Sequence, residues 1–162
     1  MRLVGEKTIL RAPNIKDSEL ILGWENSEDT VRVSSHYGGY QQSDIEEYIR
    51  GIKDVYLDKQ LRFIICSGEK AIGTIDLFDV DFDLGVASVG LLIAEQEHRN
   101  QGRGSESISL LVEYCTETLS LECLNAQILI DNLVSISFFK KMGFKEISSD
   151  GRIVLMQLEL RK

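Results

Sequence analysis

A glycine pair stands where an apolar strand pattern changes into an amphipathic helix pattern, and this junction constrains the fold most strongly. Residues 86–94, VASVGLLIA, read as a strand, and RNQGRG follows at residues 99–104. From Ile108 onward, apolar residues recur with helical spacing in SESISLLVEYCTETL. The pattern predicts a strand that delivers a glycine loop to the first turn of a helix.

This loop combines the features of an anion-binding site. Gly102 and Gly104 remove side chains that would keep a ligand from the backbone, and the first N–H groups of a helix have no partner within it. The helix dipole and the side chains of Arg99 and Arg103 add positive charge. The loop is therefore predicted to hold a phosphate-like anion; a flexible turn with solvated arginines is the alternative. Ser107 stands where a dinucleotide-binding fingerprint requires its third glycine, and the Walker pattern is also absent.

Composition limits the functional classes. A length of 162 residues suits a single domain spanning residues 1–162. The excess of 26 acidic over 18 basic residues argues against binding to nucleic acid and mildly favours a cationic partner. No apolar run is long enough to cross a membrane, the start lacks the apolar core of a signal peptide, and the three cysteines lack the spacing of a metal site. We therefore expect a cytoplasmic protein without a membrane partner or metal.

The remaining periodicity predicts a mixed α/β fold. The expected strands cover residues 3–10, 61–67, 71–80, 86–94, 124–130 and two closing segments around 144–149 and 152–160. The expected helices cover residues 16–29, 43–57, 105–119 and 133–142. Ser43 and Glu46 match a capping box at the start of the second helix. This order predicts an α/β protein with a mixed, mostly antiparallel central sheet and helices on both faces.

Two motifs carry a resemblance to a known family. The segment from Arg99 to Gly104 matches the Gln/Arg-x-x-Gly-x-Gly/Ala signature of the GNAT superfamily of acetyl-CoA-dependent N-acetyltransferases. Asn132, which lies 28 residues after Gly104 and precedes a short helix pattern ending in Gly143-Phe144, resembles the second cofactor motif of that family. Over residues 3–160 the chain resembles the branch that contains ribosomal-protein alanine acetyltransferases and spermidine or diamine acetyltransferases. The resemblance implies the GNAT-like acyl-CoA N-acyltransferase fold and acetyl-CoA as co-substrate.

The resemblance also implies a set of cofactor contacts. The strand at 86–94 would diverge from the next strand and leave a wedge for the pantetheine arm, and a backbone N–H there would stabilise charge on the thioester oxygen. The glycine loop would cradle the pyrophosphate. Asn132 would bond the pantetheine arm, although its position also predicts a plain helix N-cap. The implied cofactor-binding residues are Leu92, Ile93, Ala94, Arg99, Gln101, Gly102, Arg103, Gly104, Ser105, Asn132 and Phe139.

Two positions that carry catalytic groups in many relatives are changed in this chain. The tyrosine that protonates the leaving thiolate corresponds to Phe139, and a glutamate that acts as base aligns with Ser88. Asp76 is the best remaining carboxylate for the base, because desolvation in its apolar strand would favour uptake of a proton. A surface carboxylate on a half-exposed strand is the alternative for Asp76.

The acceptor is predicted from the acidic residues of the N-terminal half. Trp24, Tyr37 and Asp76 are the expected substrate-site residues, and carboxylates near them favour a cationic small amine, first of all a polyamine or diamine such as spermidine. Acidic helix faces that are merely solvated are the plainer interpretation. Acetylation of a protein N-terminus is the alternative enzymatic function. The changes at Phe139 and Ser88 also leave open a non-catalytic acyl-CoA sensor, and a homo-oligomer stays open as well.

Overall fold

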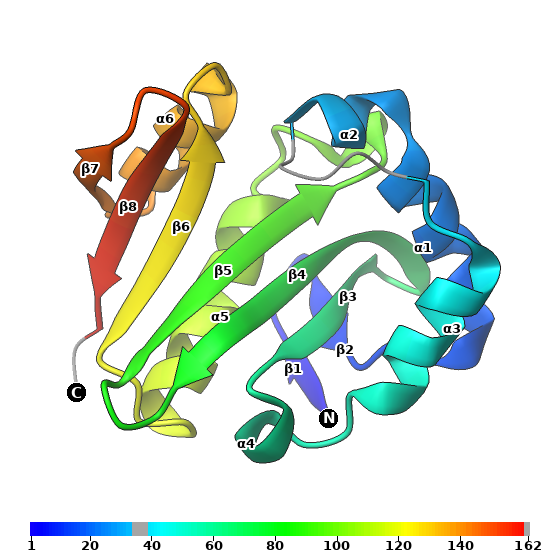
Figure 1. The fold of residues 1–162 in the computed structure, drawn as a ribbon. Coiled ribbons are helices and arrows are strands. Elements are labelled where there is room, and N and C mark those ends of the chain that lie inside the picture. Colours follow the sequence, from blue (N-terminus) through cyan, green and yellow to red (C-terminus); the bar gives the residue numbers. More distant parts are fainter. Residues whose placement is uncertain (34–38, 161–162) are drawn as a thin grey trace.

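The structure is a computed structural model that describes residues 1–33 and 39–160, and Figure 1 shows their fold. Within these residues eight strands form one sheet, with helices packed against it. The strands are β1 (Arg2–Val4), β2 (Ile9–Arg11), β3 (Leu61–Ser67), β4 (Lys70–Asp81), β5 (Val86–Ile93), β6 (Cys123–Leu129), β7 (Lys145–Ser149) and β8 (Ile153–Glu159). The helices are α1 (Ser18–Asn26), α2 (Glu28–Val33), α3 (Gln42–Gly51), α4 (Val55–Asp58), α5 (Arg103–Glu117) and α6 (Leu133–Lys141), with short 3-10 turns at Ile15–Asp17 and Gln96–His98.

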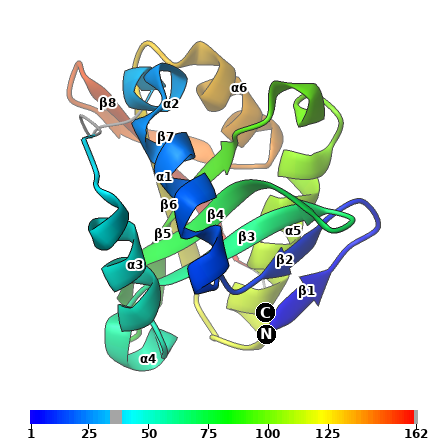
Figure 2. The ribbon, with the colours of Figure 1, turned by 90° about the vertical axis from the view of Figure 1, so that its right-hand side faces the viewer.

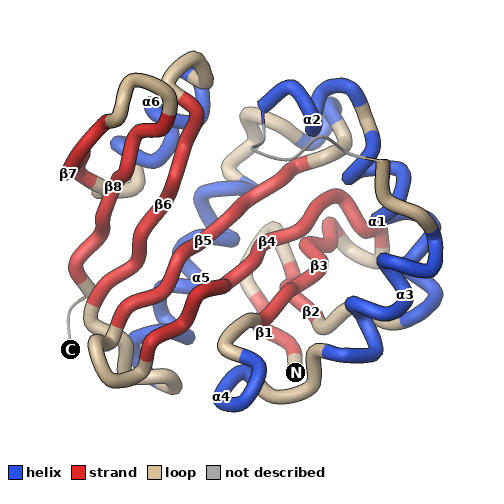
Figure 3. Tube along the Cα trace, in the orientation of Figure 1, coloured by secondary structure: helices blue, strands red, loops and turns tan. Residues whose placement is uncertain are grey.

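The sheet has the order β1-β2-β3-β4-β5-β6-β8-β7, and its neighbouring strands are antiparallel except for β5 and β6. The parallel pair is short: Val86 pairs with Cys123, Ala87 with Leu124 and Ser88 with Asn125. Beyond these pairs the two strands diverge, as Figure 3 shows. The predicted mixed, mostly antiparallel sheet is confirmed, and the divergence of its central strands opens the sheet in the middle.

Helices cover both faces of the sheet, as predicted, and alternation along β3 shows why. Phe63 and Ile65 are buried in the larger core cluster, to which α5 and α6 contribute. Ile64 and Cys66 point to the opposite face and are buried in a smaller cluster with residues of α1 and α3. Because successive side chains of a strand point to opposite faces, one strand supports two helical layers. Figure 2 shows α1 and α3 on one side of the sheet and α5 on the other.

The single edge strand predicted at residues 3–10 is wrong, because the segment folds into the hairpin of β1 and β2. The amide of Gly5 donates to the carbonyl of Thr8 at 2.8 Å and closes the turn. The carboxylate of Glu106, from the first turn of α5, accepts hydrogen bonds from the amides of Glu6 and Lys7. A partner almost one hundred residues away therefore stabilises the turn, which local periodicity does not reveal.

The boundaries of the first helices also differ from the prediction. The helix expected at 16–29 is interrupted at Ser27, whose ψ of 146° is extended, and α2 starts after it. The expected capping box of Ser43 and Glu46 is wrong: Gln41 is the N-cap of α3, and the side chain of Asp44 accepts from the Gln41 amide at 2.8 Å. The helix expected to reach residue 57 ends at Gly51, and α4 follows as a separate turn.

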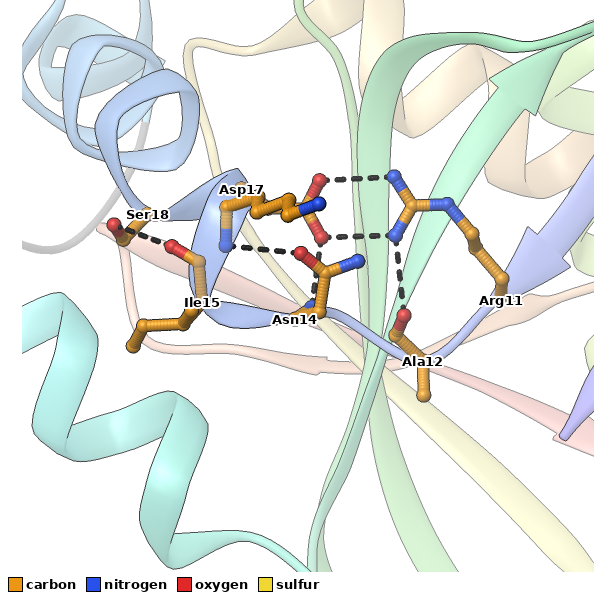
Figure 4. Close-up of polar contacts among 7 residues, drawn as sticks. Arg11, Ala12, Asn14, Ile15, Asp17 and Ser18 are labelled. Carbon is orange, nitrogen blue, oxygen red and sulfur yellow. Dashed lines mark hydrogen bonds and ion pairs between the residues drawn. The ribbon is translucent and has the colours of Figure 1, made fainter.

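An ion pair fixes the chain between β2 and α1. Arg11 donates through Nη1 and Nη2 to the two carboxylate oxygens of Asp17, each at 2.8 Å, and Asp17 also accepts from the amide of Asn14 at 2.8 Å, as Figure 4 shows. Burial raises the pKa of Asp17, but the hydrogen bonds from Arg11 and Asn14 outweigh burial and leave its pKa below the usual value. The start of α1, which carries Glu25 toward the site described next, is thereby held to the sheet.

Candidate active site

A cavity of about 480 Å³ lies where β5 and β6 diverge. Its apolar part is lined by side chains and backbone of the two strands and by α6, including Leu91, Leu92 and Phe139. Its other part is polar and is lined from α1, α3, β3 and β4. The polar lining residues include Glu25, Tyr40, Asp44, Tyr48, Arg62, Thr74 and Asp76. One opening therefore joins an apolar cleft between strands to a charged compartment under the N-terminal helices.

The glycine loop lies at the start of α5, as predicted. Gly102 is the N-cap with a φ of +81°, a left-handed conformation that glycine adopts without a steric penalty. A Cβ on Gly104 would lie 3.4 Å from side-chain atoms of both Leu91 and Phe138. The two glycines thus serve different purposes, since Gly102 turns the chain into the helix and Gly104 allows the helix to start close to β5 and α6.

The two arginines of the loop make hydrogen bonds within the protein, one to the end of β5 and one within the loop. Arg99 donates through Nε to the carbonyl of Ile93 at 2.8 Å, and Arg103 donates through Nη1 to the side chain of Gln101. The Nε of Arg103 is buried, and no group in residues 1–33 or 39–160 accepts a hydrogen bond from it. An unpartnered buried N–H beside a helix N-terminus suits a site that receives an anionic group.

The backbone at the end of β5 supplies polar groups to the cleft. The amide of Ala94 donates to the carbonyl of Ile72 at 2.8 Å, so this amide is occupied within the sheet. Because N–H groups alternate between the two edges of a strand, the amide of Ile93 faces the β6 side, where β6 has moved away. Of the three residues expected to present backbone groups, Ile93 is therefore the one with an amide directed toward the cleft.

Asn132 and Phe139 both line the cavity from the second predicted motif. Asn132 is the N-cap of α6, since its Oδ1 accepts from the amide of Ser135 at 3.2 Å. Phe139 is buried, with its ring 5.3 Å from that of Phe138 and 5.0 Å from that of Phe144 in edge-to-face contacts. The N-cap function of Asn132 is confirmed, and a contact of either residue with a cofactor stays a prediction.

A charged cluster occupies the polar compartment. Arg62 donates through Nε and Nη2 to the two oxygens of Asp76 at 2.6 and 2.8 Å, and its Nη1 lies 3.3 Å from Glu25. The guanidinium carbon also lies 5.0 Å from the centre of the Tyr48 ring. Burial is the largest influence on Tyr48 and raises its pKa to about 12, so this hydroxyl keeps its proton at neutral pH. Asp76, the predicted base, is thus a member of an ion-pair cluster rather than an isolated carboxylate.

The other predicted substrate residues are placed differently. Trp24 is buried in the smaller core cluster with Ile21 and Ile45 and is not among the residues that line the cavity. Tyr37 lies outside the described residues. Tyr40, which is half-exposed, lines the polar compartment instead.

Arg62 is the residue of the site that periodicity alone did not single out. The signal was present in the strands expected at 61–67 and 71–80, because antiparallel pairing across the three residues between them sets Arg62 opposite Asp76. The observed register confirms this pair. Opposite charges on directly facing strand positions are a recognisable cross-strand signal.

The described ranges contain neither a metal-binding cluster nor a membrane-spanning helix. Among residues 1–33 and 39–160, no group of three or more His, Cys, Asp or Glu side chains is arranged to hold a metal ion. Within the same ranges no helix has the length and apolar character needed to cross a membrane. The candidate chemistry therefore rests on the cavity, the glycine loop and the charged cluster.

A glycine loop at a helix start, beside a cleft between diverging parallel strands, is the arrangement that the resemblance to acyl-CoA-dependent acyltransferases implies. The family model for the acetyltransferase (GNAT) domain matches residues 7–145. The chain therefore belongs to the GNAT acetyltransferase family and is an acyltransferase.

Individual relatives agree with this assignment. The chain is 27% identical to an N-acetyltransferase 9-like protein from Caenorhabditis briggsae, over 99% of this chain and 85% of that protein. It is 26% identical to the mouse alpha/beta-tubulin-N-acetyltransferase 9, over 98% of this chain and 69% of that protein. Its fold is similar to that of the Vibrio cholerae spermidine N-acetyltransferase in complex with CoA and spermine, with a TM-score of 0.85, 17% identity, and coverage of 96% and 97% of the two chains.

Proposed function

We propose that this protein is an acetyl-CoA-dependent N-acetyltransferase that acts on a cationic primary amine, with a polyamine or diamine such as spermidine as the leading acceptor. The observation that carries the proposal is the charge of the polar compartment. Among its described lining residues are the carboxylates of Glu25, Asp44 and Asp76, against the guanidinium of Arg62. An ammonium group is the ligand that such a net negative, partly enclosed compartment attracts.

The donor side of the cavity suits CoA. The helix start at Gly102 and Arg103 presents N–H groups for a pyrophosphate. The buried Nε of Arg103 is a further donor, because no described residue accepts a hydrogen bond from it. Ile93 presents its amide on the β6 side of β5, and Asn132 and the buried Phe139 line the cavity. Acetyl-CoA supplies the acetyl group as an activated thioester when it is bound. The printed description of the Vibrio cholerae neighbour, a complex with CoA, supports this choice of donor.

Asp76 stays our proposed proton acceptor for the amine. Arg62 uses one lone pair on each carboxylate oxygen, and each oxygen has a second lone pair. The ion pair fixes the direction of the carboxylate, so we expect Asp76 to hold the ammonium and to take its proton as the nitrogen forms its new bond. Glu25, on the far side of Arg62, keeps the cluster net negative.

A protein N-terminus is the second candidate acceptor, because the mouse relative is named a tubulin N-acetyltransferase. An N-terminal ammonium satisfies the same carboxylates as one end of a diamine. The two candidates differ in the second charge, since spermidine carries further ammonium groups along its length and a peptide continues as a neutral backbone.

The test is an acceptor panel with acetyl-CoA, in which release of free CoA thiol is followed. The panel contains spermidine, spermine, a diamine, a monoamine, and peptides with tubulin and ribosomal-protein N-termini. Thiol release that depends on a polyamine supports the leading acceptor, and release only with peptides supports the second. Binding of acetyl-CoA without release on any acceptor would indicate a sensor and would overturn the enzymatic proposal.

The Asp76→Asn variant tests the proton acceptor in the same assay. We expect turnover to fall by about a hundredfold while acetyl-CoA affinity stays unchanged. Asp83→Asn is the matched control, because Asp83 is an exposed aspartate in the turn that follows β4. Near-normal turnover of Asp76→Asn would exclude Asp76 as the base.

A further inference from the structure

The turn between β1 and β2 is built against the first turn of α5. The carboxylate of Glu106 accepts from the amide of Lys7 at 2.8 Å and from the hydroxyl of Thr8 at 2.9 Å, and also from the amide of Glu6. Gly5 leaves the space for this carboxylate, because a Cβ there would lie 2.4 Å from Glu106 Oε1. Thr8 is fully buried. Hydrogen bonds to Glu106 thus connect the turn of the N-terminal hairpin to the first turn of the helix that follows the glycine loop.

The contact between this turn and α5 places the side chain of Lys7 beside the glycine loop. The Nζ of Lys7 donates to the carbonyl of Gln101 at 3.1 Å and lies 3.0 Å from the position that a Cβ on Gly102 would occupy. Its ammonium group therefore lies against the two residues that lead into α5. An ammonium has three N–H donors, and the bond to Gln101 uses one of them.

Each of the two loop arginines already uses one N–H donor in a hydrogen bond within the protein. Arg99 uses its Nε on the carbonyl of Ile93, and Arg103 uses its Nη1 on Gln101. Lys7 is exposed, so its remaining donors can reach a ligand from the solvent side. A compact, mobile cation at this place complements the fixed N–H groups of the helix start.

We propose that Lys7 is a cofactor-binding residue: its ammonium binds a phosphate group of CoA, and Glu106 positions it by holding the hairpin turn. The inference rests on the proposed use of acetyl-CoA. It adds to that site a cation from the N-terminal hairpin, a part of the chain remote in sequence from the glycine loop. Glu106 is a positioning residue, because its carboxylate is occupied by the turn and not directed to the ligand.

The experiment measures the equilibrium affinity of the full chain for CoA, dephospho-CoA and S-acetylpantetheine, the last of which has no phosphate. We expect Lys7→Gln to weaken CoA binding by about fivefold at low salt and Lys7→Arg to stay within about twofold of the wild type. Glu106→Gln should weaken CoA binding in the same direction, because the turn loses a charged acceptor. Lys145→Gln is the control, since Lys145 lies on β7 at the opposite edge of the sheet.

The three ligands separate the explanations. A loss with both CoA and dephospho-CoA assigns the contact to the pyrophosphate, and a loss with CoA alone assigns it to the 3′-phosphate; both support the proposal. An equal loss with S-acetylpantetheine, or no loss with any ligand while the wild type binds CoA, overturns it. Failure of the wild type itself to bind CoA would instead refute the proposed function.

Discussion

Removal of the Arg62 guanidinium tests how much the ion pairs of Arg62 with Asp76 and Glu25 contribute to the free energy of unfolding. The side chains of Arg62, Asp76 and Glu25 are 12%, 23% and 14% exposed, so Arg62→Met leaves the carboxylate of Asp76 without its cation where little water reaches it. Loss of one partner from a fully buried pair costs about 3–5 kcal/mol. The partial exposure of Asp76 places the expected loss near the lower end, about 3 kcal/mol. In a domain of this size, that loss corresponds to a fall in Tm of roughly 6–12 °C.

Urea unfolding of four proteins measures the coupling: wild type, Arg62→Met, Asp76→Asn and the double variant. Because Asp76→Asn removes the carboxylate that has lost its Arg62 partner, the double variant should be more stable than Arg62→Met alone by about 1–2 kcal/mol. Arg50→Met, at an exposed arginine of α3, is the control and should stay within about 0.5 kcal/mol of the wild type.

Two results would refute this reasoning. One is a loss below about 1 kcal/mol for Arg62→Met, which is the range of exposed ion pairs. The other is a double variant whose loss equals the sum of the two single losses, because additivity would mean that Arg62 and Asp76 do not interact.

Three further outcomes follow from the geometry. Gly102→Val should weaken CoA binding by about tenfold or more, because a branched side chain is strained at a φ of +81°; unchanged affinity in a calorimetric titration would remove the loop from the cofactor site. Asp17 has a lowered pKa in the folded state, so its pair with Arg11 stabilises the fold at neutral pH and loses this effect as pH falls through about 4 and below. Urea unfolding at pH 7 and pH 3 should therefore show Asp17→Asn less stable than wild type at pH 7 and a smaller gap at pH 3; a constant gap would contradict the linkage. Burial raises the pKa of the Cys115 thiol to about 12, so iodoacetamide at pH 8 should not label this residue in the folded protein, and rapid labelling detected by mass spectrometry would contradict its burial.

The glycine loop at the start of α5 and the N-cap of α6 could be predicted from the sequence because they are local features. Gly102 is the N-cap of α5, Gly104 lies in the first turn of that helix, and Asn132 caps the helix that it directly precedes. Turn chemistry and capping act over a few residues, so periodicity and residue type are enough to place them. The same holds for β3, β4 and β5, which follow one another through short turns, but not for the hairpin of β1 and β2, whose turn is held by Glu106.

The acceptor side could be predicted only in part, because its residues meet through tertiary contacts. Trp24 has the helical spacing of an inward residue, but spacing does not distinguish a core position from a cavity wall, and the structure buries it in the core. Glu25 reaches Arg62 from a different element, and Glu106 reaches Lys7 across the chain. Such pairs depend on how helices are set against the sheet, which a single sequence pattern does not determine.

The charged cluster also affects how strongly each of the two candidate acceptors binds in the polar compartment. Arg62 already neutralises part of the charge of Asp76 and Glu25, so an ammonium bound at Asp76 gains less there than at an isolated carboxylate. The remaining attraction must come from carboxylates farther along the compartment, of which Asp44 at the start of α3 is one. A diamine carries a second ammonium that can pair with such a group, whereas a monoamine does not. The ratio of turnover with a diamine to turnover with a monoamine of similar length therefore reports on acceptor class more directly than either rate alone, and Asp44→Asn should lower that ratio if a second ammonium is recognised.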